Sequence, residues 1–196
     1  MDPKLQTFTD DELVSAFRRG DEQAFEMLVL RYKNPLYQYI MSMTQDEGAA
    51  ADLFQETFIS FFKNADKYEA RGKFKSWLFL AARNRTLNFF RDRDKLSSLD
   101  GTDEEDGLSL HETLPDGTLP PLEALSGRET EEEIRRATLN LPQRQREMIY
   151  LRQYFSFKEI AQMLGRPLGT VLADCHRAVK KMQSLLAREN AQEVSL

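Results

Sequence analysis

Basic side chains gathered in two short segments are the groups in this sequence best suited to chemistry. Residues 71–94 carry seven basic and two acidic side chains, and residues 144–188 carry nine basic and three acidic ones. Positive groups at such density suit contacts with the phosphates of a nucleic acid. Residues 95–127, between the two segments, carry one basic and eight acidic side chains. The net charge of −5 therefore conceals two candidate phosphate-facing surfaces.

The second basic segment contains the pattern of two helices joined by a tight turn. Ser156 precedes Glu159 by three residues, which predicts a capped helix start, and Gly165 permits the turn that ends this helix. A second helix is expected from Gly169 and Thr170 onward. Its inner face is assigned to Val171, Cys175, Ala178 and Met182. This layout is a helix-turn-helix, whose second helix enters the DNA major groove, and a hairpin that merely packs is the alternative.

The front of that second helix carries an unexpected carboxylate. Leu172, Ala173 and Asp174 stand where a DNA-reading helix usually presents positive charge. Asp174 could accept a hydrogen bond from the N4 amino group of a cytosine, or it could lie in the first turn and favour the helix dipole. Leu172 and Ala173 could touch a thymine methyl group. Phosphate contact is then expected from Arg144, Lys158, Arg166, Arg177, Lys180 and Lys181.

Helical periodicity extends through the first part of the chain, and the alternation typical of strands is absent. Thr9 and Glu12 fit a capping box at the first helix, Gly20 can end that helix, and Asp21 can start the next. Pro35 is expected to kink the second helix. We therefore predict an all-α chain with two small helical domains, at residues 1–94 and 128–196.

The segment between these domains, residues 95–127, is expected to be a flexible acidic linker. Its glycines, prolines and acids cannot bury enough apolar surface to offset the entropy of ordering. The acidic run 103–106 could mimic a nucleic-acid strand in a basic channel, or it could be a solvated spacer.

Several classes of protein are disfavoured by composition. The single cysteine, Cys175, excludes an intramolecular disulfide, and its place on an inner helix face favours packing over a metal or redox site with His111 and His176. The N-terminus lacks a signal-peptide pattern, and no apolar run approaches the roughly 18 residues of a membrane span. A cytoplasmic location is expected. Neither a nucleophile paired with a base nor a phosphate-cradling glycine loop is visible, which argues against an enzyme.

Three stretches of sequence resemble bacterial RNA polymerase sigma factors of the extracytoplasmic-function type, group 4 of the sigma-70 family. The C-terminal stretch resembles their region 4 domain, in the patterns FKEIAQMLGRPLGTV at 157–171 and HRAVKKM at 176–182. Residues 52–58, DLFQETF, resemble the helix that grips the polymerase clamp helices, and residues 74–91, FKSWLFLAARNRTLNFFR, resemble the region that melts and reads the minus-ten promoter element. The resemblance covers about residues 10–94 and 125–187.

The resemblance implies three binding surfaces, of which the first two belong to a sigma region 2 bundle and the third to a sigma region 4 helix-turn-helix. The polymerase-binding residues would be Asp52, Leu53, Gln55, Glu56 and Phe58. The residues that bind the minus-ten element would be Arg71, Lys73, Lys75, Arg83, Asn84, Arg85, Asn88 and Arg91. The residues that bind the minus-thirty-five element would be Lys158, Arg166, Thr170, Leu172, Ala173, Asp174, Arg177, Lys180 and Lys181.

Aromatic and basic residues around 68–75 are expected to form a loop that holds a flipped base of the melted strand. Phe74 and Trp77 are expected to be core residues more than stacking platforms. Four positions depart from the family pattern: Ala51 and Asn88 replace acids, and Leu172 and Asp174 replace bases. The last two departures predict an unusual minus-thirty-five element, or weaker dependence on it.

The function implied is that of a sigma factor, which binds the polymerase core and directs promoter recognition, promoter melting and transcription initiation. The expected partners are the β′ clamp helices and β subunit of the core, promoter DNA and an anti-sigma factor. No cofactor, metal or small-molecule substrate is expected. A stand-alone helix-turn-helix regulator is the alternative, but it would leave the 52–58 helix and the basic helix at 74–94 unexplained.

Overall fold

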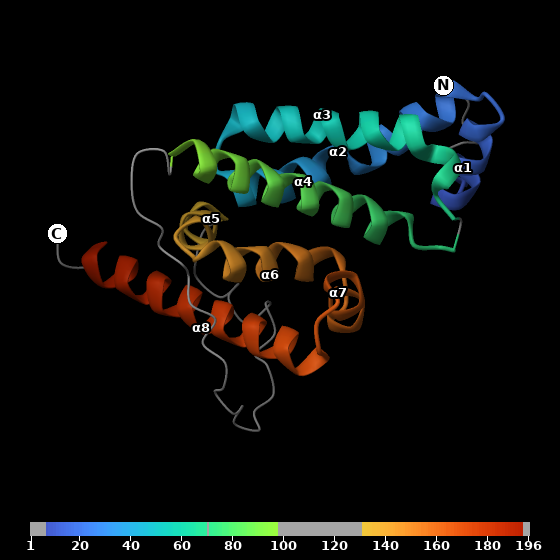
Figure 1. The fold of residues 1–196 in the computed structure, drawn as a ribbon. Coiled ribbons are helices and arrows are strands. Elements are labelled where there is room, and N and C mark those ends of the chain that lie inside the picture. The colour runs from blue at the N-terminus through green and yellow to red at the C-terminus, as the bar shows by residue number, and fades with distance from the viewer. Residues whose placement is uncertain (1–6, 70, 98–130, 194–196) are drawn as a thin grey trace. The chain divides into compact units, whose positions relative to one another are not determined.

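The computed structural model of the protein describes residues 7–69, 71–97 and 131–193. The chain divides into two compact units, Met1–Lys95 and Leu96–Leu196. Within the described ranges every regular element is a helix, which confirms the predicted all-α class (Figure 1). Residues 95–97 of the predicted linker belong to a helix, while most of that linker and its acidic run at 103–106 lie outside the described residues.

In the first unit, the structure assigns the following helices among the described residues. They are α1 (Asp10–Arg18), α2 (Glu22–Thr44), α3 (Glu47–Asn64), η2 (Ala65–Lys67) and α4 (Phe74–Ser97). Helix α2 packs against both α1 and α3. Helix α4 joins them through aromatic contacts, in which Phe74 meets Tyr32 of α2 and Phe61 of α3.

Local sequence signals place the helix boundaries of this unit. The Glu12 side chain accepts a hydrogen bond from the Thr9 amide at 2.7 Å, and the Glu12 amide donates to the Thr9 hydroxyl at 3.3 Å, which confirms the predicted capping box. Gly20 follows α1 with φ of 95°, a conformation that glycine adopts without strain. Asp21 caps α2 as expected, and α2 is assigned as one continuous helix through Pro35.

The core of the first unit is largely aromatic. Phe61 is fully buried, and its ring lies 5.0 Å from that of Phe74, 5.7 Å from that of Trp77 and 6.1 Å from that of Phe25. Phe74 is 1% exposed, so the prediction that it belongs to the core is confirmed, and Trp77 is half-buried beside it. This packing fixes how α4 lies on α2 and α3.

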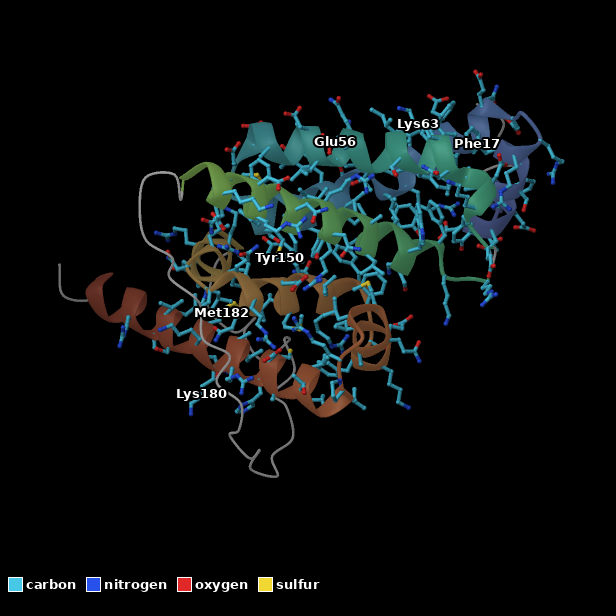
Figure 2. All side chains as sticks on the ribbon, in the orientation of Figure 1. Phe17, Glu56, Lys63, Tyr150, Lys180 and Met182 are labelled. Atoms are coloured by element: carbon cyan, nitrogen blue, oxygen red, sulfur yellow. The ribbon has the colours of Figure 1, made fainter. Side chains whose placement is uncertain are left out.

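The second unit contains α5 (Glu131–Leu139), α6 (Gln143–Tyr154), α7 (Phe157–Leu164) and α8 (Leu168–Glu193). Helix α8 packs against each of the other three. The core cluster of this unit comes from α5, α6, α8 and the connection between α5 and α6, and it is formed by Ala137, Leu141, Ile149, Cys175, Ala178, Val179, Met182 and Leu186. Figure 2 shows Met182 on the side of α8 that faces α5 and α6, and Lys180 on the opposite side.

Candidate functional site

Helices α7 and α8 form the predicted helix-turn-helix. Ser156 and Glu159 cap α7 reciprocally, with the Ser156 amide donating to the Glu159 carboxylate at 2.7 Å. Gly165 ends α7 in the left-handed conformation, with φ of 62°, and the Arg166 amide donates to the Ala161 carbonyl at 3.0 Å. Helix α8 starts at Leu168, two residues before Thr170. The turn is therefore set by local sequence, as expected.

Packing of α8 determines which of its residues are available to a ligand. The four predicted inner-face residues are at most 3% exposed, which confirms their assignment: Val171, Cys175, Ala178 and Met182. Among the predicted DNA-binding residues, those exposed are Lys158, Arg177, Lys180 and Lys181, and those partly buried are Arg166, Thr170, Leu172 and Ala173. The outward side of α8 therefore presents one basic face, on which Lys180 is labelled in Figure 2.

Asp174 lies differently from both sequence-based interpretations. It is the seventh residue of α8, beyond the first turn, and it is 4% exposed. Its Oδ1 accepts a hydrogen bond from Arg177 at 2.6 Å. Its Oδ2 lies 3.3 Å from Nε of Arg144 and 3.4 Å from Nη1 of Arg166. The carboxylate is thus enclosed by arginines, neither presented at the front of the helix nor placed where it would favour the dipole.

The exposed face of α4 brings together part of the predicted minus-ten set. Asn84, Asn88 and Arg91 are spaced by four and three residues, and all three are exposed. The Asn88 side-chain carbonyl accepts a hydrogen bond from Arg91 at 2.8 Å. Lys75, Arg83 and Arg85 are partly buried, and Nη1 of Arg85 donates to the Ala81 carbonyl at 3.5 Å. Amide and guanidinium groups are therefore aligned along one side of the helix.

The segment between η2 and α4, where a base-binding loop is expected, is held by helix α1. Asp11 accepts hydrogen bonds from the Tyr68 hydroxyl at 2.8 Å and from the Gly72 amide at 2.6 Å. Arg18 donates to the carbonyls of Ala65 and Tyr68. Tyr68 is 5% exposed, and this burial, followed by the Asp11 contact, raises the pKa of its hydroxyl well above the usual value. Sequence reasoning assigned no role here to Asp11 or Arg18.

At the outer end of this segment Arg71 and Lys73 are exposed, and Arg71 pairs with Glu69. Arg71 and Lys73, two of the predicted minus-ten residues, are thus on the surface of the first unit, on either side of Gly72, whose amide is bound by Asp11. Since surface ion pairs contribute little to stability, the Arg71 pair does not prevent a contact with phosphate.

Helix α3 presents the predicted polymerase-binding residues on two different sides. Asp52, Gln55 and Glu56 are exposed, and Glu56 is labelled in Figure 2. Leu53 and Phe58 are each 5% exposed, so their side chains belong to the core, and their part in polymerase binding stays a prediction. Burial follows from helical spacing, because both residues lie on the side of α3 that packs in the unit.

Two apolar side chains extend the exposed side of α3. Ile59 is 50% exposed and Phe62 is 52% exposed, and with Asp52, Gln55 and Glu56 they follow helical spacing along one face. The Phe62 ring rests 5.2 Å from those of Phe17 and Phe25. The sequence analysis did not assign Ile59 or Phe62 to this face. For Phe62 a signal was available in the Phe61–Phe62 dipeptide, because two neighbouring rings on a helix cannot both face the core.

Cys175 belongs to the core of the second unit. It is 3% exposed, burial raises the pKa of its thiol, and no cluster of three or more potential metal ligands occurs among the described residues. His111 lies outside the described residues. We expect iodoacetamide to alkylate Cys175 slowly at neutral pH in the folded protein and rapidly in urea, because little thiolate forms in the core. Equal rates in the two states would contradict this placement.

Two established protein families match the sequence, one in each unit. Residues 28–96 match Sigma-70 region 2, and residues 131–182 match Sigma-70, region 4. Among characterised proteins, the chain is 31% identical over 180 residues to the ECF RNA polymerase sigma factor SigW of Bacillus subtilis, covering 88% of this chain and 94% of SigW. It is 27% identical to the ECF RNA polymerase sigma-E factor of Escherichia coli, covering 93% of this chain and 99% of that protein.

Solved structures share the fold. The sigma factor RpoE, crystallised with the anti-sigma factor NepR from Bartonella quintana, superposes with a TM-score of 0.64 at 24% identity, over 83% of this chain and 96% of that one. CnrH, solved in complex with the cytosolic domain of CnrY, gives a TM-score of 0.63 at 22% identity, over 92% of this chain and 99% of that one. No described helix is long and apolar enough to cross a membrane.

Proposed function

The chain belongs to the extracytoplasmic-function group of RNA polymerase sigma factors, and from that premise we propose which of its surfaces perform each step of initiation. A sigma factor binds the polymerase core and directs it to promoters, so this protein is a transcription initiation factor. One observation carries the assignment of surfaces. Each unit has an aligned set of exposed polar or basic side chains on a helix whose opposite side is fixed in the core.

The exposed face of α3 is the surface that binds the polymerase clamp helices. Asp52, Gln55 and Glu56 supply carboxylate and amide groups suited to basic residues on a partner. Ile59 and Phe62 continue this face and supply apolar area that a partner can bury. Leu53 and Phe58 contribute from beneath, by holding the helix in the unit.

Charge reversal on this face tests the proposal. Glu56→Lys should weaken binding of the full chain to the polymerase core about tenfold or more, because like charges brought together at an interface cost several kcal/mol. Binding would be measured by fluorescence anisotropy and transcription by run-off assay. The control is Glu26→Lys, which reverses another exposed acid, on α2. Equal loss in both variants would indicate a general charge effect and contradict the assigned face.

The exposed face of α4 and the segment before it bind the minus-ten element. Asn84 and Asn88 have amide groups that can both donate to and accept from base edges. Arg91 and the exposed Arg71 and Lys73 suit the phosphates of the displaced strand. The partly buried Lys75, Arg83 and Arg85 would act at the margin of this surface.

The basic face of α8 binds the minus-thirty-five element in the major groove. Thr170, Leu172 and Ala173 lie near the start of α8, where a recognition helix reads bases. The exposed cations that suit the flanking phosphates are Lys158, Arg177, Lys180 and Lys181. We do not assign base reading to Asp174, because its carboxylate is buried among arginines.

Three broader properties complete the proposal. The protein acts in the cytoplasm, where bacterial RNA polymerase works, and it has no catalytic activity of its own. An anti-sigma factor controls it, as the complex of RpoE with NepR suggests by analogy of fold. A stand-alone regulator would instead protect promoter DNA from nuclease without the core. Footprinting with and without core polymerase separates the two, and protection that is independent of the core would contradict the assignment.

A further inference from the structure

The second unit contains a buried carboxylate that joins three separate elements. Arg144 lies at the start of α6, Arg166 in the turn between α7 and α8, and Arg177 on α8. We call these three residues the arginine trio. All three approach Asp174, at distances of 3.3, 3.4 and 2.6 Å. A single side chain therefore fixes the relative positions of guanidinium groups that lie up to 33 residues apart in sequence, between 144 and 177.

The carboxylate of this cluster is more deeply buried than the guanidinium groups around it. Three guanidinium groups approach the one Asp174 carboxylate. The side chain of Asp174 is 6% exposed, whereas those of Arg144 and Arg177 are 49% and 48% exposed and that of Arg166 is 25% exposed. The negative charge is thus inside, and the guanidinium groups of Arg144 and Arg177 are the more exposed part of the cluster. A surface anion would be attracted to the trio and shielded from the carboxylate.

Stability alone gives little reason for such an arrangement. Taking a carboxylate out of water carries a desolvation cost that often cancels the attraction of its partners. An arginine fork that is already fixed, however, loses less conformational freedom when it binds a phosphate through two parallel hydrogen bonds. Each guanidinium has five N–H donors, and the Asp174 carboxylate engages only part of those of Arg144 and Arg177.

We propose that Asp174 is a positioning residue that holds the arginine trio as a clamp for DNA phosphates beside the recognition helix. This inference rests on the proposed binding of the minus-thirty-five element by the second unit. It assigns Asp174 a role in affinity and docking geometry and none in reading bases. It also gives a structural basis for the phosphate contact expected of Arg144, which Asp174 ties from α6 to α8.

The test compares Asp174→Asn with the wild type in the full holoenzyme. The probe is a duplex carrying the minus-thirty-five region of a promoter recovered by transcribing a genomic library. Asparagine keeps the shape but removes the charge that gathers the trio, so binding should weaken about tenfold, as expected for loss of a charge-assisted hydrogen bond. The slope of log affinity against log salt should become shallower by about 0.9 for each phosphate that the trio no longer neutralises. The ranking of single-base variants of the probe should stay unchanged.

A double-mutant cycle separates positioning from other roles. In an Arg144→Ala, Arg177→Ala background, Asp174→Asn should have little further effect, because the groups it positions are already gone. Arg188→Ala, which removes an exposed arginine farther along α8, should leave the full effect of Asp174→Asn in place. Circular dichroism and thermal unfolding of each variant would show that the second unit is folded.

Each contrary result identifies a different error. Tighter binding by Asp174→Asn would mean that the carboxylate merely repels DNA, and altered preference at one base pair would mean that it reads a base. Either result overturns the inference and leaves the proposed function standing. If the wild-type holoenzyme recovered no promoter at all, the proposed function would fail and the inference with it.

Discussion

Asp11→Asn should slow formation of the open promoter complex by about tenfold or more while leaving polymerase binding unchanged. The Asp11 carboxylate accepts hydrogen bonds from the Tyr68 hydroxyl and the Gly72 amide, and an asparagine has only one oxygen left to accept them. Of these two donors the Tyr68 side chain is buried and Gly72 is exposed, and leaving a buried donor unpaired costs about 1–3 kcal/mol. The expected consequence is a loosened segment before α4, where we propose that a flipped base is held. Permanganate footprinting of unpaired thymines would measure opening.

A neighbouring residue provides a matched control for this prediction. Asp10 belongs to the same turn of α1, and its carboxylate accepts hydrogen bonds from Arg31 at 2.6 Å and from Tyr32 at 2.5 Å. These contacts tie α1 to α2 and do not involve the segment before α4. Asp10→Asn should therefore lower the stability of the first unit without a selective effect on opening. Equal slowing by the two substitutions would show that stability, and not the position of the loop, limits promoter melting.

A premelted template makes the interpretation sharper. If the segment held by Asp11 acts while the duplex opens, a template with an unpaired minus-ten region should restore part of the transcription activity that Asp11→Asn removes. No restoration would place the defect at a later step. Tyr68→Phe should give an intermediate effect, because it removes the hydroxyl contact and keeps the one to Gly72.

Features determined by short-range sequence were predictable. The capping boxes at Thr9 and Ser156 and the left-handed Gly165 depend on residues within one turn of helix, so their patterns could be recognised directly. The inner face of α8 followed from helical spacing, and its core residues are confirmed. The same reasoning placed the start of α8 slightly late, since Leu168 is already helical.

Features determined by distant contacts were not predictable from one sequence. Asp11 meets Tyr68 and Gly72 across 57 and 61 positions, and no local pattern relates these residues. Asp174 was assigned to the first turn and to the helix front because its partners on α6 and in the turn could not be known. Leu53 and Phe58 were predicted as part of one motif, and the sequence alone did not show that both lie on the buried side of α3.

The family pattern has basic residues at two positions near the start of α8 where this chain has Leu172 and Asp174. Positive charge was expected at positions 172 and 174, and its absence predicted an unusual minus-thirty-five element or weaker dependence on it. The structure relocates the positive charge to Arg144, Arg166 and Arg177, which an acid at position 174 can gather and a base there would repel. Asp174, the departure from the family pattern, thus pairs with three arginines whose side chains remain partly exposed.

The aromatic core of the first unit offers a test of how far the two units are independent. The chain has a single tryptophan, Trp77, which lies in the first unit, and a single cysteine, Cys175, which is buried in the second. Tryptophan fluorescence therefore reports unfolding of one unit, and thiol alkylation reports unfolding of the other. The same urea titration can follow both signals.

Phe61→Ala should lower the free energy of unfolding of the first unit by about 3–5 kcal/mol, the usual cost of truncating a buried phenylalanine. The Phe61 ring is fully buried among those of Phe25, Phe74 and Trp77, so the cavity cannot be filled without moving α4. The midpoint reported by Trp77 should fall, whereas the midpoint reported by Cys175 alkylation should not change. If both midpoints fell together, the two units would unfold as one cooperative body, and separate actions on the two promoter elements would need another explanation.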